Sequence, residues 1–380
     1  MMPAAVIRDE ALAHNIREMQ TFADRIGAHL CPHGKTTMSP ELFAMQLEAG
    51  AWGLTAATAH HVRVYRRLGV KRIFLANQLA GAADLEFVLS EVAADPGFDF
   101  YCLVDSAAGA DRLAAAGEAS DCSPRLQVLI ETGAAGGRAG VRSAEEAVVL
   151  ARHIHALPQL VIRGVETFEG ISMRGAGRAQ AGTILDVSLA AAGEIARARL
   201  FAEGAILMSA GGSAFLDLCE AKLPVELEGL PVERVIRPGC YVTHDSGIYE
   251  RLTRPGGAPL PGLPDLRHAL EVWSVVLSVP EPGLAIVAAG KRDLSFDVEP
   301  PRPLWRHRPG SVSEPLRAED LEVVSMWDQH LSLRDPAGAL SVGDLVGFGI
   351  SHPCATFDRW RALFRIDSAY RVSGTVTTLF

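Results

Sequence analysis

The chain has 380 residues, of which 48% are hydrophobic and 21% charged, and its formal net charge at pH 7 is -9. This hydrophobic fraction supports a folded core and excludes a disordered chain. The negative charge, without clustered Lys and Arg, argues against a nucleic-acid-binding surface. No apolar run reaches the roughly 20 residues of a membrane-spanning helix, and the N-terminus lacks a signal-peptide pattern. The six cysteines form no Cys-x-x-Cys pair, so we expect a reducing cytoplasm and no disulfides.

Short apolar segments alternate with amphipathic segments along the first 210 residues. The predicted elements, in chain order, are strand 3–8, helix 10–26, strand 28–31, helix 39–49, strand 53–57, helix 59–68, strand 72–76, helix 83–93, strand 98–104, helix 106–116, strand 126–131, helix 143–156, strand 160–167, helix 180–203 and strand 205–209. This alternation is typical of parallel strands joined by helices. Roughly eight such units predict a closed (β/α)8 barrel, with an open doubly wound sheet as the alternative.

The composition changes near residue 230. From there on Pro, Gly and β-branched residues are frequent, and runs such as 270–276 and 345–350 have the character of strands. We therefore expect a barrel domain formed by residues 10–230 and a mostly β domain formed by residues 1–9 and 231–380.

Lys35 lies in the segment CPHGKTT, residues 31–37, directly after a predicted strand. Side chains just beyond barrel strands point into the mouth where barrel active sites form. A desolvated lysine amine there suits a Schiff base with a carbonyl cofactor, and His33 would support proton transfer or orient the cofactor. The alternative is an ordinary solvated lysine.

Two glycine-rich segments also follow predicted strands. Arg138 belongs to the segment 133–141, where an ordinary solvent-facing loop is the alternative. The segment from Ser209 to Ser213 reads Ser-Ala-Gly-Gly-Ser. Successive backbone N–H groups and a serine hydroxyl can cradle a phosphate there, although most such sequences are simple turns.

His352 and Cys354 are two residues apart near the end of the chain. An imidazole and a thiolate at this spacing can ligate one divalent ion, and two protein ligands leave positions open for water or substrate. A buried structural pair is the alternative.

The stretch 33–79, with its H-x-K-T, A-G-A, A-T and L-A-N motifs, resembles the pyridoxal-phosphate enzymes of the alanine-racemase type. More narrowly, it is similar to the group of D-threonine aldolases and D-serine dehydratases, although Cys31 stands where that group usually has arginine. The resemblance covers most of the chain. It implies an alanine-racemase-like fold, pyridoxal 5′-phosphate held by Lys35, and a homodimer.

The resemblance also assigns roles to the remaining motif residues. It implies that Lys35 and His33 are catalytic and that Arg138 contacts the cofactor ring. Phe168 stands near a Tyr or His of the group and cannot replace its hydrogen bond. The implied phosphate contacts are Ser209, Gly211, Gly212 and Ser213, with Tyr241 of the R-P-G-x-Y segment as a further contact or as a packed aromatic residue.

The same group has a zinc-binding H-x-C motif in its dehydratases and H-x-D in its aldolases. Cys354 with His352 therefore favours a dehydratase with zinc, with manganese, cobalt and magnesium as alternatives. The expected substrate is a β-hydroxy amino acid of D configuration, such as D-serine, D-threonine or 3-hydroxyaspartate, and the expected products are a 2-keto acid and ammonia. The alternatives are an aldolase that forms glycine and an aldehyde, and a non-catalytic protein that binds pyridoxal phosphate. The roles of Glu169, His330 and Asp245 stay open.

Overall fold

The structure is a computed structural model that describes residues 1–120, 125–170, 177–311, 315–318 and 320–380, so Cys122 lies outside the described residues. Contacts between residues group the chain into two compact units. The barrel unit comprises Gln20–Lys35 and Gln46–Gly239, and the β unit comprises Met1–Met19, Thr36–Met45 and Cys240–Phe380.

The barrel unit contains, within the described residues, eight parallel strands in the order β2-β10-β8-β7-β6-β5-β4-β3. Their bounds are β2 (Ala28–Leu30), β3 (Leu54–Ala56), β4 (Arg72–Gln78), β5 (Asp99–Val104), β6 (Leu126–Thr132), β7 (Leu160–Thr167), β8 (Ile206–Ala210) and β10 (Leu230–Ile236). The two ends of this order are joined because Thr55 N–H donates to Pro32 O at 2.7 Å and His33 forms a parallel bridge with Thr55. The sheet closes on itself, which confirms the predicted barrel and excludes the doubly wound sheet.

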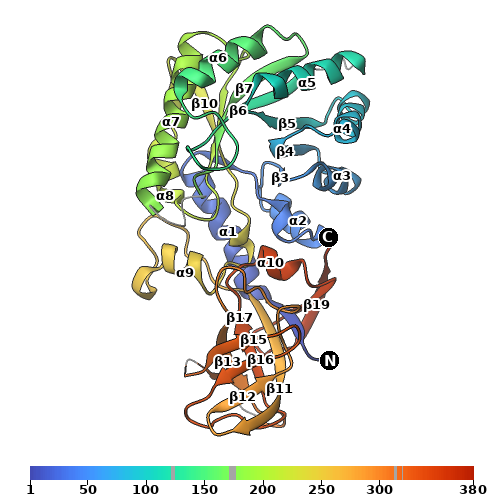
Figure 1. Ribbon diagram of the computed structural model, residues 1–380, viewed down its shortest axis with the longest axis vertical. Coiled ribbons are helices and arrows are strands. Elements are labelled where there is room, and N and C mark those ends of the chain that lie inside the picture. The colour runs from blue at the N-terminus through green and yellow to red at the C-terminus, as the bar shows by residue number, and fades with distance from the viewer. Residues whose placement is uncertain (121–124, 171–176, 312–314, 319) are drawn as a thin grey trace. The chain divides into compact units, whose positions relative to one another are not determined.

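Helices precede or follow the barrel strands in the chain, and the helices after β3, β4, β5, β6, β7 and β8 lie on the outer side of the sheet (Figure 1). Their bounds are α1 (Asp9–Arg25), α2 (Pro40–Glu48), α3 (Ala59–Arg67), α4 (Ala82–Ala94), α5 (Ala107–Ala119), α6 (Ala144–His155), α7 (Gly177–Arg197) and α8 (Leu216–Lys222). Thr58, Ser106 and Ser143 cap α3, α5 and α6, because each side-chain oxygen accepts a backbone N–H of the first turn. These caps explain why helix starts were predictable from the sequence.

Two elements differ from the sequence prediction. The helix expected to reach residue 203 ends at Arg197, because Arg199 adopts a left-handed backbone (φ 55°) and Leu200 N–H returns to Ile195 O. The eighth barrel strand is β10, within the Pro- and Gly-rich part that was expected to be outside the barrel. A two-residue strand, β9 (Glu226–Leu227), pairs antiparallel with its start.

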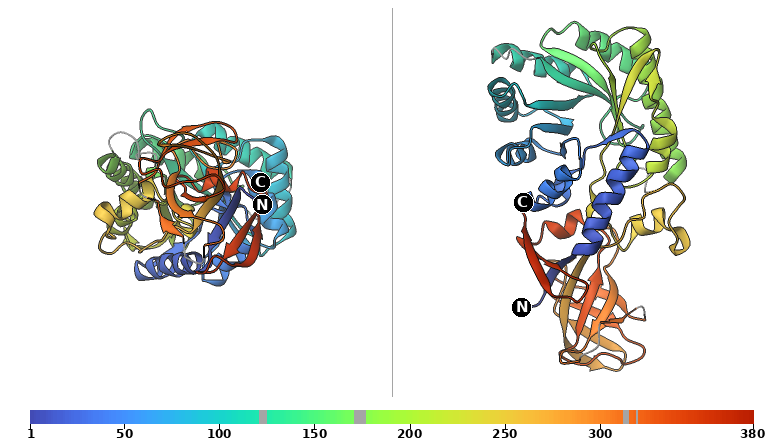
Figure 2. Two further views of the ribbon diagram at one scale, coloured as in Figure 1. Left: turned by 90° about the horizontal axis from the view of Figure 1, so that it is seen from below. Right: turned by 180° about the vertical axis from the view of Figure 1, so that it is seen from behind.

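The β unit contains a sheet in the order β14-β13-β17-β11-β1-β18-β19, extended by β12, β16 and β15. Figure 2 shows the orange and red strands of this unit from two further directions. The bounds are β1 (Ala4–Arg8), β11 (Leu270–Glu281), β12 (Leu284–Val287), β13 (Arg302–His307), β14 (Leu316–Arg317), β15 (Glu322–Met326), β16 (Leu331–Arg334), β17 (Leu345–Gly349), β18 (Ala362–Ile366) and β19 (Val372–Thr377). The first strand, β1, pairs antiparallel with β11 and parallel with β18. The short helices are α9 (Ile248–Thr253), α10 (Cys354–Phe357) and the 3-10 turns η3 (Cys240–Val242) and η4 (Pro255–Gly257).

Candidate active site

Polar side chains lie at the carboxyl ends of the barrel strands, next to the apolar side chains that fill the barrel interior. Residues two positions apart in a strand share a face, and the interior cluster includes Cys31, Leu103, Leu129, Leu207 and Val235. Two positions farther along the chain, each of these strands carries a polar residue. We call this set the polar ring, and it consists of His33, Asp105, Glu131, Ser209 and Arg237, together with Glu166, which pairs in register with Glu131 and Ser209. The ring therefore lies at the end of the barrel where active sites of this fold form.

Arg237 and Glu166 form a buried ion pair in the polar ring, with side chains 3% and 1% exposed. Arg237 also donates from Nε to Ser209 Oγ at 2.8 Å, and its guanidinium lies 5.0 Å from the ring centre of Phe74. Burial raises the pKa of Glu166 to about 7; Arg237 opposes this shift, and Glu131 adds to it. Neither member of the pair was assigned a role from the sequence, although Arg237 opens the R-P-G-x-Y segment. The available signal for Glu166 was a glutamate beside apolar residues near the end of a predicted strand.

Lys35 lies in the 3-10 turn η1 (Gly34–Thr36), directly after the first barrel strand, and its side chain is exposed. Nearby His33 is half-buried, and its Nδ1 atom is buried without a hydrogen-bond partner among the described residues. Burial holds the pKa of His33 well below its usual value. Three nearby positive charges lower it further: Arg237, Lys35 and Arg138. His33 is therefore a neutral base in a positive field, which suits an anionic ligand such as a phosphate ester.

Arg138 is exposed, and its guanidinium lies 5.1 Å from the centre of the Phe168 ring. A cation at this distance from an aromatic face is attracted to it. Phe168 also packs close to Gly212, where an added Cβ would lie 2.9 Å from the phenyl Cε2. Phe168 thus provides an aromatic surface that positions Arg138.

The predicted phosphate cradle already has a partner inside the chain. The buried carboxylate of Glu169 accepts the backbone N–H groups of Gly211 at 3.0 Å and Gly212 at 3.1 Å. Burial raises the pKa of Glu169 although these N–H groups oppose the shift. A phosphate at the two glycines would therefore require Glu169 to be protonated or to turn away.

Ser209 is also engaged, since its hydroxyl donates to Val235 O at 3.2 Å and accepts from Arg237. Ser213 is half-buried at the following turn. The phosphate contacts of Ser209, Gly211, Gly212 and Ser213 stay predictions.

His352 and Cys354 follow the last central strand of the β unit, β17, and Cys354 begins α10. His352 Nδ1 lies 2.7 Å from Asp297 Oδ2, which leaves Nε2 as the nitrogen for a metal. A carboxylate behind a ligating histidine commonly fixes its orientation. Asp297 was missed in the sequence, because no local pattern links it to a residue 55 positions away.

The sulfur of Cys354 contacts the sulfur of Cys240 and the hydroxyl oxygen of Thr36 within the β unit. Cys354 Sγ lies 3.7 Å from Cys240 Sγ and donates to Thr36 Oγ1 at 3.3 Å. Hydrogen bonding by Cys240, with a further contribution from His352, holds the pKa of the Cys354 thiol well below its usual value. Interaction with Cys354 raises the pKa of His352 to about 9, and Asp297 adds to this shift.

The donor pair fits a divalent ion. A readily formed thiolate and an oriented imidazole suit zinc, and the two ligands leave further coordination positions open. Among the described residues, no group of three or more His, Cys, Asp or Glu side chains is arranged to hold a metal ion.

The other candidates from the sequence have distinct surroundings. Tyr241 is buried in η3, where it stays a predicted phosphate contact. His330 is exposed in the turn between β15 and β16, where Trp327 N–H donates to its carbonyl. Asp245 is buried and accepts the N–H groups of Tyr249 and Glu250, so it caps the start of α9.

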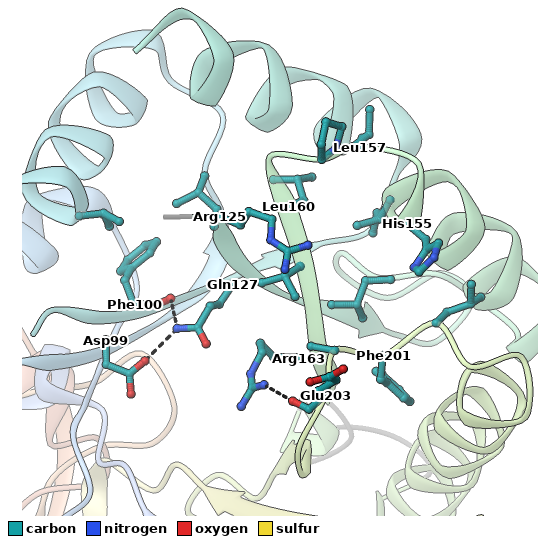
Figure 3. A pocket seen from close by; sticks show the side chains of 18 of the residues that line it. Asp99, Phe100, Arg125, Gln127, His155, Leu157, Leu160, Arg163, Phe201 and Glu203 are labelled. Atoms are coloured by element: carbon teal, nitrogen blue, oxygen red, sulfur yellow. Dashed lines mark hydrogen bonds between the residues drawn. The ribbon is translucent and has the colours of Figure 1, made fainter. Parts of the chain in front are cut away.

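A cavity of about 850 Å³ lies at the opposite end of the barrel, among the starts of its strands (Figure 3). Gln127 donates to Asp99 Oδ1 at 2.8 Å, and Arg163 donates to the carbonyl of Glu203 at 3.2 Å. This end of a barrel generally serves stability rather than chemistry. We therefore place the candidate active site at the polar ring and not in this cavity.

No helix in the described part of the chain is long and apolar enough to cross a membrane. Comparison with known families gives two matches. The alanine racemase N-terminal domain matches residues 7–217, and the putative serine dehydratase domain matches residues 269–366.

Comparisons with individual proteins give the same picture. The 3-hydroxy-D-aspartate aldolase of Paracoccus denitrificans strain Pd 1222 is 25% identical over 344 residues, 90% of this chain and 82% of the relative. The D-threonine aldolase from Filomicrobium marinum has a TM-score of 0.81 at 22% identity and covers 100% of this chain and 95% of its own.

The D-threo-3-hydroxyaspartate dehydratase from Delftia sp. HT23 has a TM-score of 0.77 at 24% identity, over 100% of this chain and 97% of its own. Further similar structures are those of a D-threo-3-hydroxyaspartate dehydratase as a histidine-to-alanine variant and as a cysteine-to-alanine variant in the metal-free form, with the two substituted positions two residues apart. These comparisons confirm the predicted family and the alanine-racemase-like fold.

Proposed function

This chain belongs to the family defined by the N-terminal domain of alanine racemase, and on that premise we propose that it is a pyridoxal-phosphate- and metal-dependent lyase of β-hydroxy-D-amino acids. More specifically, we propose a dehydratase that forms a 2-keto acid and ammonia. The observation that carries this choice is the pair of His352 and Cys354, with Asp297 hydrogen-bonded to the imidazole. The D-threo-3-hydroxyaspartate dehydratase variants support it, because a histidine and a cysteine with the same spacing are substituted there and the cysteine variant is in a metal-free form.

Lys35 is the residue that would hold the cofactor carbonyl. When bound, pyridoxal phosphate withdraws electrons from an amino acid and stabilises negative charge at its α-carbon. Once the substrate amine has taken its place, the Lys35 amine would accept the α-proton. His33 is neutral because of its low pKa and so would accept rather than donate a proton.

The positive groups of the barrel mouth would bind the anionic parts of cofactor and substrate. Arg138 lies against Phe168 at the surface of this mouth, where a guanidinium can pair with a carboxylate or the cofactor ring oxygen. Arg237 donates to Glu166 and Ser209, which hold its guanidinium in place, so it would contribute positive charge at the polar ring.

His352 and Cys354 would supply two ligands to a divalent ion, for which zinc is the proposed identity. A metal at this pair would act as a Lewis acid on the β-hydroxyl group and make hydroxide a better leaving group. Asp297 would hold the imidazole in place through Nδ1.

An aldolase is the second candidate. It is favoured by two of the relatives, the 3-hydroxy-D-aspartate aldolase and the D-threonine aldolase. In that reaction a base would deprotonate the β-hydroxyl group, and the bond between Cα and Cβ would break to give glycine and an aldehyde. Cys354 favours the dehydratase, because the aldolase branch of the resembling group has an aspartate there.

The products decide between the two reactions. The protein should be incubated with pyridoxal phosphate, zinc or manganese, and D-serine, D-threonine or D-3-hydroxyaspartate in turn, with the L enantiomers as controls. A 2-keto acid and ammonia in equal amounts are the expected result. Glycine and an aldehyde would establish the aldolase instead. A coloured protein that converts none of these substrates would support a non-catalytic carrier of the cofactor.

A further inference from the structure

Cys240 and Cys354 bring two thiols together in the β unit. Their Sγ atoms lie 3.7 Å apart, although 114 positions separate them in the sequence. We propose that these two residues are a redox modification site, in which hydrogen peroxide converts the pair into a reversible disulfide.

Exposure selects Cys354 as the first residue to react. Among the described cysteines Cys354 alone is not buried, whereas Cys31, Cys102, Cys219 and Cys240 are. Thiol oxidation follows access to the oxidant, and a neighbouring thiol can then resolve the oxidised sulfur. Cys240 has the position of such a resolving cysteine.

The reaction balances with hydrogen peroxide as the only oxidant. The Cys354 thiolate attacks one peroxide oxygen, the O–O bond breaks, and the products are a sulfenic acid on Cys354 and hydroxide, which takes up the thiol proton as water. The Cys240 sulfur then attacks the sulfenic sulfur, the S–S bond forms, and the S–O bond breaks to release a second hydroxide. That hydroxide takes up the proton of the Cys240 thiol. Two thiols lose two electrons and two protons, and one peroxide becomes two waters.

The movement that bond formation requires is small. A disulfide has an S–S length of about 2.05 Å, so the two sulfurs must approach by about 1.7 Å. Cys354 Sγ also has a hydrogen bond to Thr36 Oγ1 at 3.3 Å and a hydrogen bond with His352, which a rotation of the side chain would weaken. A thiol is a weak donor, so the bond to Thr36 is a small obstacle to rotation of the side chain.

The consequence for catalysis rests on the proposed function. A cysteine binds a metal ion as the thiolate. In the disulfide, the sulfur of Cys354 is no longer available as a thiolate. Oxidation would therefore remove one of the two protein ligands, whereas a bound metal would occupy the same sulfur and shield it from peroxide. Metal binding by Cys354 and the disulfide between Cys240 and Cys354 would therefore be mutually exclusive.

The experiment uses the full-length reduced protein with its cofactor, in the presence and absence of added zinc. After brief treatment with hydrogen peroxide, the protein is unfolded, alkylated and digested. Without zinc, the alkylated thiols should fall from the six of the sequence to four, and peptides containing Cys240 and Cys354 should be linked. Dithiothreitol should restore six, and added zinc should suppress the link.

Two variants separate the pair from the other cysteines. Cys240→Ser should give no linked peptide, and Cys354 should advance to sulfinic acid because its resolving thiol is missing. Cys219→Ser, which replaces a buried cysteine of the barrel unit, is the matched control. It should form the link as the wild type does.

The outcomes distinguish this proposal from the proposed function. Six free thiols after peroxide, or wild-type Cys354 oxidised to sulfinic acid without a link, would overturn the disulfide and leave the metal assignment standing. A link that forms equally with and without zinc, and leaves zinc affinity in calorimetry unchanged, would establish the disulfide and remove Cys354 from the proposed metal site.

Discussion

The thiol of Cys354 donates a hydrogen bond to Oγ1 of Thr36 at 3.3 Å, across 318 positions of sequence. Thr36 is joined to Lys35 by one peptide bond. The contact therefore ties the metal motif at the end of the chain to the residue that follows the proposed cofactor lysine. Thr36 and Cys354 both belong to the β unit, so the contact holds Cys354 against the segment Thr36–Met45 of that unit.

Asp297→Asn tests whether the carboxylate of Asp297 orients His352, the proposed metal ligand. The amide would keep the size of the side chain but lose the charge that orients His352 through Nδ1. Replacement of such a partner typically weakens metal binding by about 10–100-fold. We expect this loss in a competition between the protein and a zinc chelator, with an unchanged unfolding temperature. Asp328→Asn, at a largely exposed aspartate of the β unit, is the control, and equal affinities in the two variants would contradict the assignment.

Glu166→Gln tests the buried carboxyl of the polar ring by its effect on stability against pH. The folded protein holds the Glu166 proton up to about pH 7, whereas the unfolded chain releases it near the ordinary value of 4.5. Between these values the folded state binds more protons, so the contribution of Glu166 to the free energy of unfolding falls as pH rises. The shift corresponds to about 3 kcal/mol across this window.

The measurement is urea unfolding of the wild type and Glu166→Gln at several pH values from 5 to 7. The stability of the wild type relative to the variant should decrease steadily with pH. A relative stability that stays constant from pH 5 to 7 would mean that Arg237 keeps Glu166 ionised and that burial does not dominate. Glu194→Gln, at an exposed position of α7, is the control, and its stability relative to the wild type should not change over this pH range.

Glu169→Gln tests the predicted phosphate cradle. The variant keeps an acceptor for one glycine N–H and removes the negative charge that would face a phosphate. The relief of one like-charge contact is worth about 1 kcal/mol or more, so pyridoxal phosphate should bind at least about fivefold more tightly by fluorescence titration. Glu203→Gln, at an exposed glutamate outside the polar ring, is the control. Weaker binding by Glu169→Gln would place the phosphate elsewhere.

The barrel could be predicted because local signals agree with it. Ser143 before an amphipathic segment and the apolar runs of β6 and β7 define their elements without tertiary information. The end of α7 and the place of β10 could not be predicted in this way. The first depends on a left-handed residue, Arg199, and the second on pairing with two distant strands.

The motif residues of the site were found by resemblance, but their partners were not. Parallel strands are buried on both faces and lack a polar alternation, so the sequence did not reveal that Glu166 faces Arg237. Asp297 and Cys240 lie 55 and 114 positions from the residues that they contact. Only folding brings such pairs together, and these partners set the charge and orientation of the motif residues.

Lys35→Ala tests whether the proposed base and cofactor anchor is this lysine. Loss of a general base typically lowers turnover by about 10²–10⁴-fold, and loss of the anchor adds to this. The variant should therefore have no measurable lyase activity and no visible absorbance with pyridoxal phosphate. Lys71→Ala, at an exposed lysine of the barrel unit, should retain both.

The central claim is that Lys35 holds the cofactor carbonyl. The most direct measurement is reduction of the protein with sodium borohydride in the presence of pyridoxal phosphate, followed by peptide mass spectrometry. The account predicts one stoichiometric phosphopyridoxyl group on Lys35. A modification confined to Lys71, Lys222 or Lys291, or no stoichiometric modification at all, would contradict it.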